Sequence, residues 1–298
     1  MSPRGGHPEA APGARDADVG AVAGLLGRPG VKYAVASHHN PDGDALGSML
    51  GLHRALVAAG HDSVMCHPDE DPRLPEMDFM FADGDVVGHG PPPDAAERVL
   101  VAVDCASAER LWVRDGLGPH AGFAGSINID HHHDNTRFAQ FNLVVPDASS
   151  SAEVVYDVLA AAGLPVDEAV ATPLYVGLIT DTGRFSYSNT GAHAHQVAAA
   201  LIEAGTDPHA VSDRLYEQQP LPRLMLAALA LGKMRSIADG RLRIAVLGPD
   251  DYAQAGGDDS EGIVELLRSI EGCVAAGLAR ETEPGWYRVS LRSSVPEL

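Results

Sequence analysis

Three apolar runs of strand length end directly in acidic or imidazole side chains. The runs cover residues 31–37, 99–103 and 126–129. The side chains that follow them are His38, Asp104 and Asp130, respectively. Helical patterns separate the runs, which predicts βαβ units and a parallel sheet. Because open parallel sheets place ligands beyond the carboxyl ends of their strands, we expect these polar groups to meet in one crevice.

The rest of the pattern predicts an α/β fold of two domains. Further strands are predicted at 63–66, 141–145, 242–247, 273–279 and 286–292, and helices at 44–59, after the serines 149–151, at 167–178 and at 260–270. Residues 192–237 are almost wholly helical in pattern. Residues 1–18, rich in Gly, Pro and Ala, predict a disordered tail. We therefore expect a parallel-sheet domain over 19–205, a helical connector over 206–238 and a smaller α/β domain over 239–298.

The net charge limits the partners of the chain. Asp plus Glu number 41 and Lys plus Arg 21, so the net charge is −20. A protein that grips long DNA or RNA needs a basic surface, so we expect no long nucleic acid as partner. Small anionic substrates stay open, because bound divalent cations would dominate the local field.

Membrane and disulfide signals are both weak. No stretch approaches the roughly 20 uninterrupted apolar residues of a membrane span, and the first residues lack the apolar core of a signal peptide. The 3 cysteines are scattered and form neither a CxxC pair nor an even disulfide set. These features favour a reducing, cytoplasmic location without membrane contact.

The polar residues at the strand ends match the needs of a metal site. Neutral imidazole and carboxylate groups suit Mn, Zn or Mg. Two such ions about 3.5–4 Å apart can activate a water and stabilise both oxygens of a phosphoryl displacement. A pair of ions needs about six or seven ligands, one of them a bridging carboxylate. The candidates are His38, Asp42, Asp44, Asp104, His131 and Asp181, the last in the turn after a helix.

Each part of this set also has a purely structural interpretation. Residues 40–43 alone are typical of a turn. Asp44 alone is typical of a helix N-cap, and Asp104 of a turn that ends a strand. Residues 130–132 are a weak signal by themselves, because surface histidines can be incidental. Their joint occurrence at the ends of consecutive strands favours a two-metal phosphoesterase.

Five segments, in this order, resemble motifs of the DHH phosphoesterase superfamily, and specifically its nanoRNase and pAp-phosphatase branch. They are 37–48 (SHHNPDGDALGS), 103–107 (VDCAS), 129–135 (IDHHHDN), 150–156 (SSAEVVY) and 177–187 (GLITDTGRFSY). Residues 261–293 resemble the start of the companion DHHA1 domain. The resemblance implies a DHH metal-binding catalytic domain followed by a DHHA1-like substrate-binding domain.

The resemblance also implies which residues hold the metal ions. His38 and Asp42 would bind the first ion, and Asp44, His131 and Asp181 the second. Manganese is the usual metal of the family. The expected cofactors are therefore two divalent ions, Mn²⁺ with Mg²⁺ or Co²⁺ as alternatives.

Three residues are the implied catalytic groups. Asp104 would bridge the two ions, Asp130 would orient His131, and His132 would contact the scissile phosphate. A water deprotonated by the two cations would attack phosphorus in line, so no Ser or Cys nucleophile is required.

Substrate contacts are expected from both domains. His132 and Arg184 would supply them in the first domain, and Arg292 and Ser293 in the second, where a guanidinium can grip phosphate bidentately. Family members normally continue beyond the SLRS segment into a Gly-rich GGGH segment, which this sequence lacks. We therefore expect a partial, C-terminally truncated DHHA1-like domain with weakened substrate capture.

Three functions fit these observations. The leading one is hydrolysis of short oligonucleotides, pAp, or cyclic dinucleotides and their linear products. A second is an inorganic pyrophosphatase of the same superfamily, which shares the metal motifs. A third is a catalytically weakened protein that binds nucleotides, motivated by the missing Gly-rich segment. A homodimer is a further expectation, since dimers are common among relatives.

Overall fold

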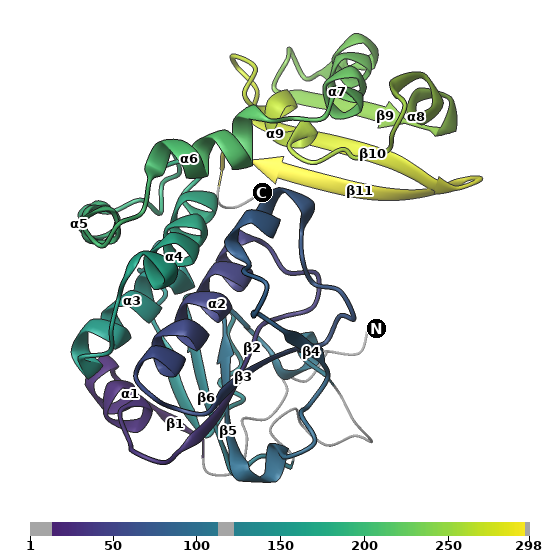
Figure 1. The fold of residues 1–298 in the computed structure, drawn as a ribbon. Coiled ribbons are helices and arrows are strands. Elements are labelled where there is room, and N and C mark those ends of the chain that lie inside the picture. The colour runs from purple at the N-terminus through teal and green to yellow at the C-terminus, as the bar shows by residue number, and fades with distance from the viewer. Residues whose placement is uncertain (1–13, 113–121, 296–298) are drawn as a thin grey trace, which may run out of the picture. The chain divides into compact units, whose positions relative to one another are not determined.

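The computed structural model describes residues 14–112 and 122–295, and it divides into two compact units. The first unit is Met1–Leu215 and the second is Tyr216–Leu298, and each is described by itself (Figure 1). The division falls within the predicted connector of residues 206–238. Among the helices of the described ranges, none combines the length and the apolar character that crossing a membrane requires.

The first unit is built on a seven-stranded sheet of order β1-β7-β6-β5-β2-β3-β4, and each pairing between its described strands is parallel. The strands are β1 (Arg15–Asp16), β2 (Lys32–Ala36), β3 (Ser63–His67), β4 (Val87–His89), β5 (Arg98–Val103), β6 (Gly125–Asp130) and β7 (Phe141–Val144). From β2 to β4 the chain moves toward one edge, and from β5 to β7 toward the other. The winding therefore reverses between β2 and β5, which is where such sheets bind ligands.

The central strands of this sheet are buried on both faces. In β2, β5 and β6 nearly all residues are buried without alternation. Successive side chains of a strand point to opposite faces, so uninterrupted burial means that both faces are covered. This burial explains why the three runs are mostly apolar, as is usual for parallel sheets.

Helices α2 and α4 of the first unit approach each other closely, and Figure 1 shows α3 beside them. The helices are α1 (Val19–Leu26), α2 (Gly43–Ala58), α3 (Ser151–Ala162), α4 (Glu168–Asp181), α5 (Ala192–Glu203) and α6 (Pro208–Ser212), with short turns η1 (Pro75–Met80), η2 (Ala95–Glu97) and η3 (Ala108–Arg110). The π-helical η4 (Asp213–Glu217) spans the division between the two units. A Cβ on Gly47 would lie 2.3 Å from the carbonyl oxygen of Pro173. Only glycine permits this approach of α2 to α4.

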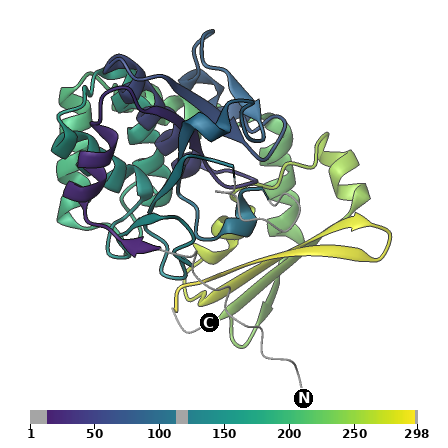
Figure 2. The same ribbon diagram turned by 90° about the horizontal axis from the view of Figure 1, so that it is seen from below.

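The second unit carries a four-stranded sheet of order β11-β10-β9-β8. Its strands are β8 (Arg235–Ile237), β9 (Leu242–Leu247), β10 (Ala275–Glu283) and β11 (Trp286–Ser293), and its helices are α7 (Leu221–Lys233), α8 (Pro249–Ala255) and α9 (Ile263–Arg268). Strands β9 and β10 are parallel, and the other two pairs are antiparallel. Its core includes Leu226, Leu247, Leu267 and Leu278. Strand β11 lies at the sheet edge and forms a long hairpin with β10 (Figures 1 and 2).

The predicted α/β fold, with a parallel-sheet domain and a smaller second one, is confirmed. Some elements differ from the prediction. Arg15–Asp16 forms β1 inside the expected tail of residues 1–18, because the backbone N–H groups of Arg15 and Ala17 bond to β7 and the residue before it. Residues 1–13 lie outside the described residues. Strands this short carry no periodic signal, which also explains why β4 and β8 were not predicted.

Candidate metal centre

Six polar side chains meet beyond the carboxyl ends of β2, β5 and β6. His38 follows β2, Asp104 follows β5 and His131 follows β6. Asp42 and Asp44 stand at the start of α2. The sixth is the last residue of α4, Asp181, which the sequence had placed in a turn after the helix. The topological switch point thus gathers residues that are up to 143 positions apart in the sequence, from 38 to 181.

The six side chains form two donor groups, and a third, overlapping group combines Asp104 and His131 with His132. One contains His38, Asp42 and Asp104, and the other Asp44, His131 and Asp181; within each group the ligand atoms lie within 4.8 Å of one another. The family resemblance implied the same six residues, with Asp104 shared by both ions, and their role as ligands stays a prediction. The donors are imidazole nitrogens and carboxylate oxygens, a set that suits Mn²⁺, Mg²⁺ or Zn²⁺. The residues therefore fit a pair of divalent cations.

Asp104 lies between the two groups. Its Oδ2 is 3.4 Å from Nε2 of His38, and its Oδ1 is 3.7 Å from Nε2 of His131. Its backbone is in the left-handed region, with φ +51°. Such a conformation is uncommon for a residue with a Cβ and concentrates at functional sites.

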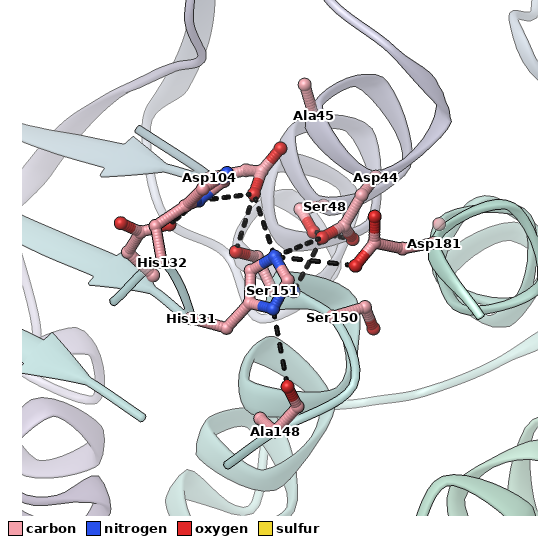
Figure 3. A network of polar contacts seen from close by, with 12 residues as sticks. Asp44, Ala45, Ser48, Asp104, His131, His132, Ala148, Ser150, Ser151 and Asp181 are labelled. Carbon is pink, nitrogen blue, oxygen red and sulfur yellow. Dashed lines mark hydrogen bonds and ion pairs between the residues drawn. The ribbon is translucent and has the colours of Figure 1, made fainter. Parts of the chain in front are cut away.

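The second group is centred on His131 (Figure 3). Its Nε2 lies 3.5 Å from Oδ2 of Asp181 and 3.9 Å from Oδ2 of Asp44, while its Nδ1 lies 3.3 Å from the carbonyl oxygen of Ala148. A proton on Nδ1 that faces this carbonyl leaves Nε2 free as a ligand. The imidazole is thereby oriented by the backbone.

Asp130 contacts a different histidine from the predicted one. Its Oδ1 accepts a 2.8 Å hydrogen bond from Nδ1 of His132, not from His131. Its Oδ2 accepts from Nδ2 of Asn135 at 2.5 Å. The predicted orientation of His131 by Asp130 is therefore wrong, because Nδ1 of His131 faces the carbonyl oxygen of Ala148 and Asp130 is occupied by His132 and Asn135.

The Asp130 contact determines the charge of His132. Its hydrogen bond to Asp130 raises the pKa of His132 to about 9, against the opposing effect of burial. The imidazole is therefore protonated at neutral pH. Since Nδ1 donates to Asp130, only Nε2 is available for other contacts.

The carboxylates of the site differ in their affinity for protons. Burial raises the pKa of Asp181 to about 6 and, together with the charge of Asp104, raises the pKa of Asp44 well above its usual value. Burial acts on Asp104 too, but the hydrogen bond with His38 and the nearby histidines hold the pKa of Asp104 at about 2. Asp104 is thus ionised at any physiological pH, while the other two gain from a nearby cation.

The structure confirms the turn at residues 40–43 but not Asp44 as the N-cap of the following helix. Asp42 is the N-cap of α2, accepting 3.1 Å hydrogen bonds from the N–H groups of Asp44 and Ala45. Asp44 is therefore not the N-cap and points its carboxylate toward α3. Asn40 has φ +52°, as expected of a turn at residues 40–43.

The turn that carries His38 is fixed by a residue that the sequence did not indicate. His67 is fully buried at the end of β3. Its Nδ1 accepts a 3.0 Å hydrogen bond from the N–H of Asp69. The ring proton is therefore on Nε2, which donates to the His38 carbonyl oxygen at 3.0 Å. Asp69 in turn accepts from the N–H of Asn40 at 2.7 Å. Burial lowers the pKa of His67 to about 4, so the imidazole stays neutral.

Arg110 is a second residue beside His38 that the sequence did not indicate. Its Nη2 lies 2.9 Å from Nδ1 of His38, and the same Nδ1 lies 2.9 Å from the carbonyl oxygen of His39. A nitrogen cannot accept from Arg110 and donate to His39 at once. Arg110 is the last residue of η3, six positions after Asp104, so the only available signal was its proximity to a strand-end aspartate.

The predicted substrate residues lie in both units. Arg184 is exposed in the segment after α4, with φ +61°. In the second unit, Nε of Arg292 donates to Oε1 of Glu265 at 2.7 Å, and Oγ of Ser293 donates to the Val295 carbonyl oxygen at 3.0 Å. Their role in substrate binding stays a prediction.

The chain is similar in sequence to proteins of a known family. A model described as DHH family, N-terminal domain, matches residues 32–178. A bifunctional oligoribonuclease and PAP phosphatase, NrnA of Thermus thermophilus, is 35% identical over 260 residues, which cover 87% of this chain and 75% of the relative. The chain belongs to the DHH family. It is a metal-dependent hydrolase of phosphoester bonds, as the sequence predicted.

Another relative and one solved structure are also similar to this chain. A probable bifunctional oligoribonuclease and PAP phosphatase NrnA of Streptococcus mutans is 28% identical, covering 86% of this chain and 79% of the relative. The structure of an exopolyphosphatase-related protein from Bacteroides fragilis has a TM-score of 0.81 at 23% identity, covering 91% and 82% of the two chains. At that identity the structural likeness supports the DHH fold alone.

Proposed function

We propose that this chain is a two-metal phosphoesterase that hydrolyses short oligonucleotides and 3′-phosphoadenosine 5′-phosphate, with Mn²⁺ as the preferred ion. The observation that carries the proposal is the pair of donor groups with Asp104 between them, each of its oxygens facing a histidine of a different group. The two activities in the names of the Thermus thermophilus and Streptococcus mutans relatives, oligoribonuclease and PAP phosphatase, support the two substrates.

The candidate ligands are assigned to two ions. His38 and Asp42 would hold one ion, and Asp44, His131 and Asp181 the other, with Asp104 shared. Two divalent ions bound there would supply Lewis-acid chemistry, lowering the pKa of water and offsetting negative charge on phosphate. The chain has a net charge of −20, and the positive charge of the ions would offset its repulsion of an anionic substrate.

His132 would act on the substrate directly. Its imidazolium is held by Asp130, and its side chain is 33% exposed, so Nε2 can reach a molecule in the site. A protonated imidazole can donate a hydrogen bond to a phosphate oxygen and give its proton to the leaving oxygen. The proton on Nδ1 stays on the ring because it is donated to Asp130, so the proton that leaves is the one on Nε2.

A dinucleotide assay tests the proposal. The metal-free chain is supplied with Mn²⁺ and pApA, and mononucleotide release is followed by chromatography. We expect turnover that a chelator abolishes and that Asp104→Ala lowers by about 10³-fold or more. Asp83→Asn, at an exposed loop residue, is the matched control and should retain full activity. Full turnover in metal-free buffer would refute the two-metal mechanism.

A substrate panel then separates the alternatives. The same assay is run with pApA, pAp, cyclic di-AMP and pyrophosphate. Release of phosphate from pyrophosphate alone would replace the proposal by a pyrophosphatase, and tight nucleotide binding without any product would replace it by a nucleotide-binding protein. The homodimer and the cytoplasmic location remain predictions, the first of which a sedimentation measurement tests.

A further inference from the structure

The N-terminus of α3 reaches the carboxylates of both donor groups (Figure 3). The backbone N–H of Ser151 donates to Oδ2 of Asp44 at 2.6 Å, and the N–H of Ala152 donates to Oδ1 of Asp44 at 2.9 Å. The Ser151 hydroxyl donates to Oδ1 of Asp104 at 2.9 Å. Ser151 therefore contacts two candidate ligands that come from two other elements, α2 and the end of β5.

The orientation of the Asp104 carboxylate needs such a contact. The last side-chain torsion of aspartate is broad, so the residue itself does not determine where each oxygen points. In this site the two oxygens are not equivalent, because Oδ2 faces His38 and Oδ1 faces His131. The Ser151 hydroxyl is bound to Oδ1 alone and holds that oxygen on the His131 side.

Burial strengthens the effect of this hydrogen bond. Ser151 is 0% exposed, and Asp104 and Asp44 are each 1% exposed. Water therefore does not compete for the carboxylate oxygens, and a hydrogen bond to an ionised group is stronger than a neutral one. The hydrogen bond adds to the contacts of Asp104 with His38 and of Asp44 with the Ser48 hydroxyl.

Helix capping does not account for the Ser151 hydroxyl. The N-cap of α3 is Ser150, whose Oγ accepts from the N–H of Glu153 at 3.1 Å. Ser149 and Glu153 form a further pair at the same end. Since the cap is complete without Ser151, its hydroxyl is free to serve the metal centre.

We propose that Ser151 is a positioning residue that holds the Asp104 carboxylate so that one oxygen is presented to each donor group. The proposal rests on the two-metal function above. Without this hydroxyl, Asp104 would still lie in the site, but its carboxylate could rotate and serve one group at the expense of the other. The ion held by Asp44, His131 and Asp181 would lose most, because Oδ1 is the oxygen on its side.

Manganese binding to the full-length, metal-free chain tests this inference. The free Mn²⁺ signal in electron paramagnetic resonance gives the affinities, and the spectrum of the bound ions reveals whether two neighbouring ions are magnetically coupled. For the unchanged chain we expect two bound ions and a coupled spectrum. For Ser151→Ala we expect about 10- to 100-fold weaker binding of one of the two ions and a much smaller coupled signal.

Two further variants control for effects on the helix. Ser150→Ala removes the N-cap, so it should lower the melting temperature but leave both Mn²⁺ affinities and the coupled signal unchanged. Ser151→Thr keeps the hydroxyl and should restore binding, and it should fold even if Ser151→Ala does not.

The outcomes separate this inference from the proposed function. If Ser151→Ala keeps both affinities and the coupled signal, or if Ser151→Thr behaves as the alanine variant does, the positioning role is wrong. Equal weakening in Ser150→Ala would show that only the helix end matters, and would also overturn it. If the unchanged chain binds fewer than two ions or gives no coupled signal, the two-metal proposal itself fails.

Discussion

Strands β6 and β11 each lead to a residue with a predicted catalytic or substrate role, but their surroundings are opposite. Strand β6 lies between β5 and β7, and its last residue, Asp130, is 0% exposed. Strand β11 is a sheet edge where Trp286 and Leu291 are 72% and 68% exposed. Arg292 on β11 pairs with Glu265 at the surface, where an ion pair contributes little.

The difference indicates how the two halves of the proposed chemistry are maintained. The groups after β6 are held by buried hydrogen bonds, so their geometry exists before any ligand arrives. The groups on β11 are exposed and are held by surface contacts such as the pair of Arg292 with Glu265. Substitutions near β6 should therefore change chemistry and folding, and those near β11 should change substrate affinity alone.

The largest effect is expected from His132→Gln, which removes the imidazolium after β6. We expect kcat to fall by about 10²- to 10⁴-fold, the usual contribution of a positioned acid. Because the hydrogen bond to Asp130 raises the pKa of His132, the unchanged chain should lose activity at alkaline pH, as the imidazolium loses its proton, and the variant should lack this alkaline fall. A large loss of Mn²⁺ affinity in the variant would instead make His132 a metal ligand.

A pair of core and edge substitutions tests the burial contrast directly. Ile129→Ala on β6, at a fully buried residue, should lower the free energy of unfolding by about 2–5 kcal/mol. Leu291→Ala on β11, immediately before Arg292, should change it by about 0.5 kcal/mol or less. Urea unfolding of the metal-free chain, followed by circular dichroism, measures both. Similar losses in the two variants would contradict the comparison.

Arg292→Ala tests the edge strand as a substrate element. Loss of a hydrogen bond to a charged group should raise KM for pApA about 10- to 100-fold, with kcat and Mn²⁺ affinity nearly unchanged. Arg288→Ala, an exposed arginine on the same strand, is the matched control and should have little effect. Equal effects of both variants would indicate general electrostatic attraction in place of a specific contact.

The smallest effect is a pH-dependent stabilisation by Asp181→Asn in the metal-free chain. Because burial raises the pKa of Asp181 to about 6, the folded state binds more protons than the unfolded state between the ordinary aspartate pKa and this value. Stability is therefore lost as pH rises through that window. The variant should melt a few degrees higher at pH 7.5 and no higher at pH 4, while binding Mn²⁺ more weakly. A lower melting temperature at pH 7.5 would contradict this account.

Much of the site was readable from the sequence because the signal is local. Each apolar run predicts a strand, and the residue directly after it, His38, Asp104 or Asp130, is the polar side chain expected at the carboxyl end of that strand. The winding of a parallel sheet then brings those ends to one edge. The residues that the family resemblance implied as ligands all lie in the donor groups at this edge, and their binding of metal stays a prediction.

What only the tertiary structure decided are the contacts between distant segments. The pairing of Asp130 with His132 depends on the directions of consecutive side chains, which no periodicity encodes. The contacts of Ser151 with Asp104 and Asp44 span 47 and 107 positions. The sequence by itself predicted the candidate metal ligands and the sheet edge that carries them. The orientation of those residues came from buried hydrogen bonds that form only when α2, α3 and the sheet pack together.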